Sequence, residues 1–217
     1  MLRLFKERPP FCAEFERSEI MPYNKQILQT DNILTVTEMN EAAAINISCW
    51  TYPEGYKMYN FDGYEKERDQ LFNGLHFPVY FTDSDAADKF NDCLSQTAND
   101  VPCGFIAIGP AAQVYCRGSE AFYADESFTD IGLGLRPELC GLNAGLGDAL
   151  VRAAINFVKA EFPDDGVRLT VAENNARAKK VYERNGFTAS GEFKKYINVS
   201  GRRRLNRFII MIKDQLK

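Results

Sequence analysis

The alternation of apolar and polar residues predicts a mixed succession of strands and helices. Short runs rich in β-branched and aromatic residues predict strands at 33–36, 77–82, 103–108, 128–135 and 167–172. Apolar residues at helical spacing predict helices at about 38–49, 65–72, 146–162 and 175–185. Near the end of the chain, two β-rich runs at 187–199 and 204–213 flank Ser200-Gly201 and predict a hairpin.

The helix predicted over 146–162 has the clearest pattern of the chain. Its apolar positions fall on one face: Leu146, Leu150, Ala153, Ala154, Phe157 and Val158. Its polar positions fall on the other: Asp148, Arg152, Asn156 and Lys159. The preceding strand, 128–135, ends at Arg136-Pro137, because proline cannot donate a hydrogen bond within a sheet. The order strand, glycine-containing loop and helix is therefore predicted for 128–162.

Residues 1–31 are polar and lack a sustained period, so we interpret them as an extension in front of one domain, 32–217. Residues 83–100 are predicted to form a polar insertion with one or two helical turns. The stretch 50–63 is rich in aromatic residues and contains glycine and proline. It is predicted to be a loop that caps the core, and its place also suits the wall of a substrate site.

The charge of the chain argues against nucleic acid or anionic membranes as partners. The formal net charge is −4 for 217 residues, of which 45% are hydrophobic and 26% charged. The distribution is uneven, because eight of the 26 Lys and Arg residues but one of the 30 acidic residues lie in 194–217. We interpret Arg202-Arg203-Arg204 as a solvated hairpin turn, and contact with a polyanion or another partner is the alternative.

The cysteine and histidine content limits the kinds of metal site and catalytic site that the chain can form. The six cysteines form no C-x-x-C pair, which is typical of reduced thiols in a cytoplasmic protein. The single histidine, His76, excludes a metal centre with several histidines, and no metal is expected. A hydrolase triad would need His76 itself. No apolar run is long enough for a membrane helix, and the charged N-terminus is unlike a signal peptide.

A glycine-containing loop opens the helix predicted over 146–162. Gly145-Leu-Gly147 lies where backbone N–H groups and the positive helix N-terminus can bind a phosphate. The dinucleotide pattern G-x-G-x-x-G would need a glycine at Pro137 or Leu150, and the Walker pattern occurs nowhere. By itself the loop is also compatible with an ordinary turn.

The segment from Val171 to Phe187 resembles the GCN5-related N-acetyltransferase (GNAT) family. The family pattern V-x-x-x-N-x-x-A-x-x-x-Y-x-x-x-G-F is met at every fixed position, which includes Asn175, Ala178 and Tyr182. The loop 142–147 resembles the family's Q/R-x-x-G-x-G pyrophosphate loop, and the two motifs follow in the family's order. Leu142 replaces the usual Gln or Arg, and the glycine spacing indicates a loop two residues longer.

The resemblance implies a mixed α/β fold with a splayed central sheet, flanking helices and a C-terminal hairpin. It implies acetyl-CoA bound between the strands 128–135 and 167–172, without a metal. Main-chain groups of the first strand would meet the pantetheine amides at Leu133, Gly134 and Leu135. The pyrophosphate loop would comprise Leu142, Asn143, Ala144, Gly145, Leu146 and Gly147. Asn175, an expected N-cap, and Ala178 would contact the pantetheine arm.

Tyr182 and Asp130 are the expected catalytic residues. Ala178 and Tyr182 are spaced i, i+4, so they share one face of the predicted helix. The small side chain of Ala178 would let the ligand lie close to the helix, and the Tyr182 hydroxyl could then point at the departing sulfur. The CoA thiolate needs a proton, and a phenol can supply it. Asp130 matches the glutamate that some family members use as base. Glu173 is a second candidate, and attack by an already neutral amine is a third possibility.

The sequence therefore predicts an N-acetyltransferase that takes a CoA thioester and a primary amine of a small molecule or peptide. Direct attack in a ternary complex is favoured, although Cys140 beside the loop keeps an acyl-enzyme route open. A non-catalytic CoA-binding sensor is the alternative function. A nucleic-acid binder acting through the basic hairpin is a third, against which the overall acidity argues. We expect a cytoplasmic monomer or homodimer without membrane association.

Overall fold

The computed structural model describes residues 28–30, 33–82, 84–88, 90, 101–142, 144–199 and 201–214. Their strands are β1 (Leu28–Thr30), β2 (Leu34–Val36), β3 (His76–Phe81), β4 (Gly104–Ile108), β5 (Phe128–Leu135), β6 (Gly166–Ala172), β7 (Thr188–Val199) and β8 (Arg202–Lys213). They form one eight-stranded sheet in the order β1-β2-β3-β4-β5-β6-β8-β7. Every neighbouring pair is antiparallel except β5 and β6.

The α-helices are α1 (Glu41–Ser48), α2 (Tyr64–Leu71), α3 (Ser84–Asp88), α4 (Glu120–Tyr123), α5 (Leu146–Glu161) and α6 (Ala176–Arg184). Short 3₁₀ helices are η2 (Glu54–Tyr59), η4 (Gly109–Ala112) and η5 (Pro137–Leu139). The helices predicted at 38–49, 65–72, 146–162 and 175–185 are confirmed as α1, α2, α5 and α6 within three residues at each end. Only α4 and the 3₁₀ helices have no counterpart in the prediction, because they are too short to show a period.

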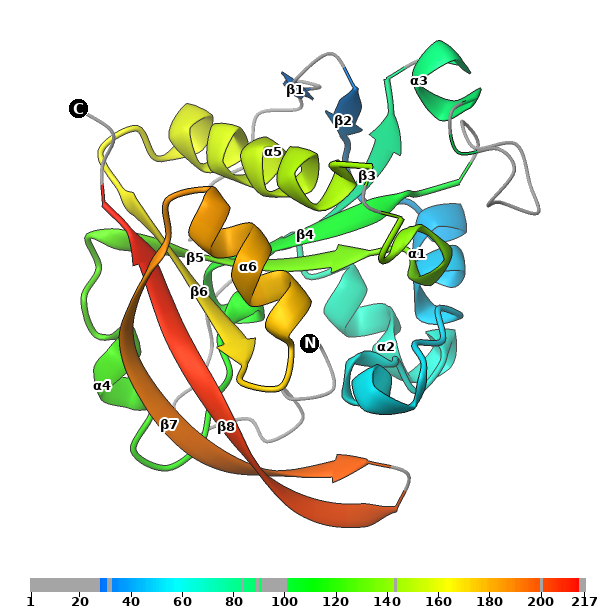
Figure 1. Ribbon diagram of the computed structural model, residues 1–217. Coiled ribbons are helices and arrows are strands. Elements are labelled where there is room, and N and C mark those ends of the chain that lie inside the picture. Colours follow the sequence, from blue (N-terminus) through cyan, green and yellow to red (C-terminus); the bar gives the residue numbers. More distant parts are fainter. Residues whose placement is uncertain are drawn as a thin grey trace.

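Helices cover both faces of the sheet, with α5 and α6 on one side and α1 and α2 on the other (Figure 1). Each face of the sheet has its own hydrophobic core. Residues of β4 contribute to both cores in alternation, since successive side chains of a strand point to opposite faces. Ile106 joins the large core that α5 covers, where the Phe77 and Phe157 ring centroids lie 4.7 Å apart. Phe105 instead packs against Trp50, in the core beneath α1 and α2. The mixed α/β class is therefore confirmed.

Two polar segments of the prediction lie only partly within the described residues. Leu28–Thr30, inside the predicted extension 1–31, pair with β2 and add the edge strand β1 to the sheet. Residues 1–27 lie outside the described residues, so the domain boundary at 31–32 stays a prediction. Of the insertion 83–100, residues 84–88 form α3, and Phe90 is buried against Phe81 with ring centroids 5.2 Å apart.

The predicted C-terminal hairpin is confirmed as β7 and β8. β8 lies between β6 and β7, and it pairs with β6 from Phe208 to Lys213. The positive φ of +78° at Gly201 marks the turn and explains the glycine there. No helix in the described part of the chain is long and apolar enough to span a membrane.

Candidate active site

The strands β5 and β6 run side by side over only part of their length. They pair in parallel from Phe128–Ile131 on β5 to Gly166–Leu169 on β6. Beyond this point β5 pairs with β4 alone and β6 pairs with β8 alone. The strands therefore diverge, and the backbone of β5 after Ile131 has no described strand beside it on the side toward β6. This is the splayed sheet that the resemblance implied.

A cleft of about 570 Å³ opens at this divergence. The end of β5, the loop before α5, the first turn of α5, one face of α6 and the segment 52–59 form its walls. Of the residues singled out in the sequence, it is lined by Leu133, Gly134, Leu135, Leu142, Ala144, Gly145, Leu146, Gly147, Asn175, Ala178 and Tyr182. Asn143 lies outside the described residues. The structure thus brings the two motifs of the sequence to one cleft.

The start of α5 presents backbone groups to the cleft. Gly145 is the N-cap with a left-handed φ of +76°, and no side chain caps the helix among the described residues. The N–H groups of the first turn therefore remain free for an anion. Gly147 also has a packing role, because a Cβ there would lie 3.3 Å from Val181 Cγ2 on α6. At Gly134, a Cβ would overlap the ring of Phe105, so this glycine lets the ring lie across β5.

Asn175 connects α6 to the cleft. Its Oδ1 accepts a hydrogen bond from the Ala178 backbone N–H at 3.2 Å, so it is the expected N-cap. Its Nδ2 donates to the Tyr59 hydroxyl at 3.3 Å. A single amide side chain thereby fixes the start of α6 and a tyrosine that lies 116 residues earlier in the chain.

Tyr182 lies in the wall of the cleft and is 6% exposed. Its ring packs edge-on against Phe187 with centroids 6.1 Å apart. Burial raises the pKa of the Tyr182 hydroxyl above its ordinary value of 10, and the neighbouring Tyr59 adds to the rise. The hydroxyl therefore keeps its proton at physiological pH, which is the state that a proton donor needs.

Three tyrosines form the opposite wall and were not singled out as site residues in the sequence. Tyr52, Tyr56 and Tyr59 line the cleft, and Tyr59 lies 6.3 Å from the Tyr52 ring and 6.5 Å from the Tyr56 ring, between centroids. The Tyr52 hydroxyl donates to the Leu135 carbonyl at 2.8 Å. Burial raises the pKa of Tyr59 to about 12, although its bond from Asn175 opposes the rise. The aromatic stretch 50–63 was the available signal.

Basic side chains of α6 line the end of the cleft near the α5 N-terminus. They are Arg177, Lys180 and Arg184. Arg184 is paired with Asp148 at 2.7 Å, and the Arg177 guanidinium lies 5.0 Å from the Tyr56 ring centroid. The sequence motif fixes no basic residue at these positions, so pattern matching missed them. Their charge makes this end of the cleft suited to a pyrophosphate.

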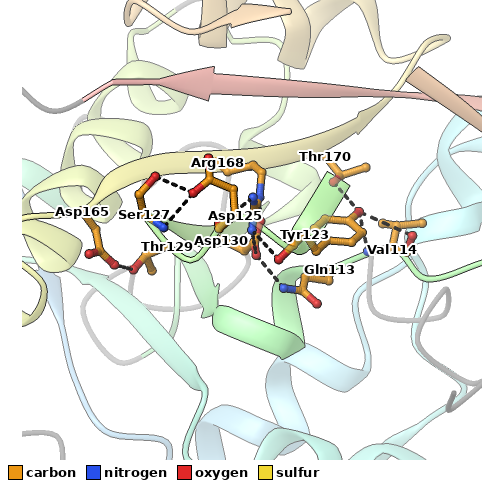
Figure 2. Close-up of polar contacts among 10 residues, drawn as sticks. All are labelled: Gln113, Val114, Tyr123, Asp125, Ser127, Thr129, Asp130, Asp165, Arg168 and Thr170. Atoms are coloured by element: carbon orange, nitrogen blue, oxygen red, sulfur yellow. Dashed lines mark hydrogen bonds and ion pairs between the residues drawn. The ribbon is translucent and has the colours of Figure 1, made fainter. Parts of the chain in front are cut away.

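The structure corrects the expectation for Asp130. It is 3% exposed and does not line the cleft. Its carboxylate accepts hydrogen bonds from Arg168 Nε and Nη2 at 2.6 and 2.9 Å, and from Gln113 Nε2 at 2.6 Å (Figure 2). Burial raises the pKa of Asp130, and the hydrogen bonds from Arg168 offset part of the rise. A carboxylate held on both oxygens away from the cleft is not placed to take a proton from an acceptor.

Arg168 is the centre of this buried cluster. It lies opposite Asp130 in the β5–β6 register, and its Nη1 and Nη2 donate to the carbonyls of Asp125 and Tyr123. The Tyr123 hydroxyl lies 2.8 Å from Thr170 Oγ1 on β6 (Figure 2). The cluster therefore ties the loop before β5 to both strands.

The other groups considered for catalysis do not fit either. Glu173 is exposed, pairs with Arg207 at 3.5 Å and does not line the cleft. Cys140 lines the cleft, but burial raises the pKa of its thiol, which disfavours the nucleophilic thiolate. His76 is 1% exposed and lies outside the cleft lining, and burial lowers its pKa to about 3. No group of three or more potential metal ligands occurs in the described part of the chain.

The cleft fits acetyl-CoA on three counts. Its volume is within the range of about 300–1,000 Å³ that small-molecule sites occupy. The first turn of α5 and the basic side chains of α6 suit the pyrophosphate. The unpaired edge of β5 offers N–H and C=O groups to an amide-containing arm, as a neighbouring strand would.

Comparison with known proteins agrees with this geometry. The model of the acetyltransferase (GNAT) family matches residues 52–187. An acetyltransferase (GNAT family) from Bacillus anthracis is 16% identical with a TM-score of 0.57, over 88% of this chain and 99% of that one. The ribosomal-protein-S18-alanine N-acetyltransferase of Escherichia coli is 18% identical with a TM-score of 0.51, over 84% and 94% of the two chains.

A further solved structure, from Salmonella typhimurium, contains its cofactor acetyl-CoA. It is 14% identical with a TM-score of 0.51 and covers 85% of this chain and 95% of that one. At these identities the structures share the fold with this chain. No curated protein sequence matches the chain. The family match spans more than half of the chain, and its motifs meet in the cleft, so the protein belongs to the GNAT family of acetyltransferases.

Proposed function

We propose that the protein transfers an acetyl group from acetyl-CoA to a primary amine of a small molecule or peptide, by direct attack in a ternary complex. The observation that carries this proposal is the position of Tyr182, a buried and protonated phenol in the wall of the cleft between the diverging strands. The thioester supplies an activated acetyl group, and the protein supplies binding and a proton.

Each part of the cosubstrate has a candidate partner. The first-turn N–H groups of α5, together with Arg177 and Lys180, would hold the pyrophosphate. The backbone of Leu133–Leu135 would bind the amides of the pantetheine arm. Because Tyr52 donates to the Leu135 carbonyl, an arm that uses this carbonyl must share it or displace the tyrosine.

Tyr182 would act on the leaving sulfur. As the amine nitrogen bonds to the acetyl carbon, the carbon–sulfur bond breaks and the sulfur takes up negative charge. Tyr182 donates its hydroxyl hydrogen to that sulfur, the amine nitrogen loses one proton to solvent, and the Tyr182 oxygen takes one proton back from solvent, which restores the phenol. The raised pKa of Tyr182 keeps the hydrogen available throughout the physiological range.

The acceptor would attack as a neutral amine. Among the described residues that line the cleft, Asp148 is the only acid, and it is already bound to Arg184 and Asn185. The proposal of direct attack also agrees with the raised pKa of Cys140. The acetyl-transfer rate at limiting amine should therefore rise with pH until the acceptor is deprotonated.

Two measurements test the proposal: the first tests acetyl-CoA binding, and the second tests turnover, which an enzyme shows and a sensor does not. Acetyl-CoA at 100 times its Kd should raise the free energy of unfolding by about 2.7 kcal/mol, whereas NAD and ATP should give smaller shifts. Thiol release from acetyl-CoA, followed with a panel of small amines and peptides, should then reveal turnover. Relatives such as the Escherichia coli enzyme, which is named for an alanine of a ribosomal protein, justify including peptides. Tight binding without turnover on any amine would favour the sensor.

A further inference from the structure

The end of the C-terminal hairpin extends beyond the strand that supports it. β6 ends at Ala172, which pairs with Phe208, so β8 from Arg202 to Arg207 pairs only with β7 from Lys194 to Val199. We call these two stretches the hairpin tip. Figure 1 shows the tip projecting from the sheet below the rest of the domain.

One face of the hairpin tip is directed toward the tyrosine wall. Ile197 and Val199 belong to an apolar cluster with Met58 and Tyr59 of η2. Arg204 is the cross-strand partner of Ile197, and Arg202 is that of Val199, so both arginines share this face. The charge of Arg204 reaches η2, since it adds to the lowering of the Glu54 pKa that a hydrogen bond from Lys57 dominates.

The hairpin tip is a concentrated positive surface on an acidic protein. Residues 194–207 include six Lys or Arg and no acid, while the whole chain has a net charge of −4. Two of the six do not add to the surface charge, because Lys195 is buried and Arg207 pairs with Glu173 and Glu192. Lys194, Arg202, Arg203 and Arg204 are exposed. The backbones of Arg202 and Arg204 pair with β7, but no hydrogen bond or ion pair joins the side chain of Arg202 or Arg204 to another described residue. The positive charges lie close together on the two strands of the tip and repel each other, so this arrangement favours an anionic partner.

We infer that the hairpin tip binds the carboxylates of an acidic peptide whose amine is the acetyl acceptor. This inference rests on the proposed function and specifies its acceptor. Guanidinium groups bind carboxylates through two parallel hydrogen bonds, so Arg202 and Arg204 supply both affinity and orientation. Among the described residues that line the cleft, Asp148 alone carries a carboxylate, and it is bound to Arg184 and Asn185, which disfavours a polyamine as the acceptor.

A peptide fits the hairpin tip better than a nucleic acid does. Nucleic-acid binding needs basic groups along the path of the backbone, whereas the basic residues here are concentrated at one end of an acidic chain. The tip also exposes an apolar cross-strand pair, Tyr196 and Leu205, which are 52% and 53% exposed. This pair lies beside Arg203 on the face of the tip opposite to Arg202 and Arg204, so it adds an apolar surface that a nucleic-acid backbone does not need.

Peptide binding and charge reversal test the inference without requiring turnover. Three labelled peptides of equal length, with a free N-terminal alanine followed by glutamates, glutamines or lysines, would be titrated with the full chain by fluorescence anisotropy. The glutamate peptide should bind at least about tenfold more tightly than the glutamine peptide, and the difference should shrink with added salt. The double variant Arg202→Glu/Arg204→Glu should lose this preference and favour the lysine peptide.

A matched control separates a local effect from net charge. The single variant Arg204→Glu is measured beside the double variant, and Lys159→Glu on the exposed face of α5 makes the same change in charge as Arg204→Glu but should leave peptide binding unchanged. The milder Arg202→Gln/Arg204→Gln variant serves if the reversed variant unfolds. All variants should keep the stabilisation by acetyl-CoA, because the tip does not line the cleft.

The outcomes for the inference and for the proposed function are distinct. Equal binding of the three peptides, or equal loss in Lys159→Glu, would overturn the inference while leaving acetyl-CoA binding intact. Tighter binding of a single-stranded oligonucleotide than of the glutamate peptide, lost on reversal of the arginines, would replace the peptide by a nucleic acid. Absence of stabilisation by acetyl-CoA would refute the proposed function even if the acidic peptide binds.

Discussion

The two ends of the β5–β6 pair differ in what holds them together. At the paired end, Asp130 and Arg168 face each other across the register, and each is 3% exposed. At the diverging end, Gly134 and Leu135 face a cleft whose other wall includes Tyr182. The same two strands thus provide a closed end that contributes stability and an open end suited to a ligand.

The open end of the β5–β6 pair lies directly beside a paired and buried end. Separating two strands leaves backbone groups without partners, which is unfavourable unless a ligand or water replaces them. At the other end of the pair, the buried Asp130–Arg168 ion pair joins the two strands. The carboxylate that the sequence suggested for catalysis is therefore assigned to the closed end, and the following changes test that assignment.

The largest expected effect is a loss of stability when the ion pair at the closed end is broken. Asp130→Asn should lower the free energy of unfolding by about 3–5 kcal/mol, because it leaves the buried Arg168 charge without a counter-charge. Chemical denaturation measures the loss, and the rate of acetyl transfer per folded molecule should stay near that of the wild type.

A double variant sharpens this result. Asp130→Leu/Arg168→Met removes both charges and keeps apolar volume, so it should be less destabilised than Asp130→Asn alone. If Asp130→Asn instead kept full stability and lost activity that returns at high pH, the carboxylate would be a general base after all.

The next largest expected effect is a fall in kcat when the Tyr182 hydroxyl at the open end is removed. Tyr182→Phe removes only the hydroxyl and keeps the ring against Phe187, so kcat should fall about 10²–10⁴-fold with little change in acetyl-CoA affinity. Steady-state kinetics and calorimetry measure the two quantities. A loss of acetyl-CoA affinity with unchanged kcat would make the hydroxyl a binding contact, and an unchanged enzyme would remove Tyr182 from the mechanism.

His76 shows what burial without a counter-charge does to a titratable group. Its pKa is lowered to about 3 in the folded chain, against about 6.5 when unfolded. Below pH 6.5 the unfolded state binds the extra proton, so stability falls as the pH drops toward 3. Between pH 7 and pH 5 this group should cost about 2 kcal/mol.

Denaturation curves at the two pH values check this figure. His76→Gln cannot titrate in this range, so its difference in stability between pH 7 and pH 5 should be smaller by about the same amount. An equal difference in the variant would show that other groups cause the acid sensitivity.

The smallest expected effect is at Tyr59. Tyr59→Phe removes the acceptor of the Asn175 amide hydrogen bond, which should reduce kcat/KM by about fivefold, equivalent to loss of one hydrogen bond of roughly 1 kcal/mol. The cap of α6 through Asn175 Oδ1 remains, so thermal stability should change little. A fall in stability equal to the fall in kcat/KM would indicate a structural role alone.

The sequence by itself determined the local elements and the positions of the two family motifs that line the cleft. The period of α5 follows from its own side chains, and β5 was predicted with the bounds it has, 128–135. Gly145, Asn175 and Tyr182 were identified because cap, turn and motif depend on residues close in the chain. Such features are local, so a pattern of neighbouring residues suffices to predict them.

Only the tertiary structure decided the roles that depend on distant partners. Asp130 was predicted as a base because its place on β5 matched, but Arg168, 38 residues later, binds it away from the cleft. The tyrosine wall and Arg177 likewise line the cleft because folding brings η2 and α6 close to each other. The direction of the hairpin tip follows from the end of β6 and the packing of Ile197 on η2. Contacts between residues far apart in the chain fix each of these roles, and no local pattern encodes them.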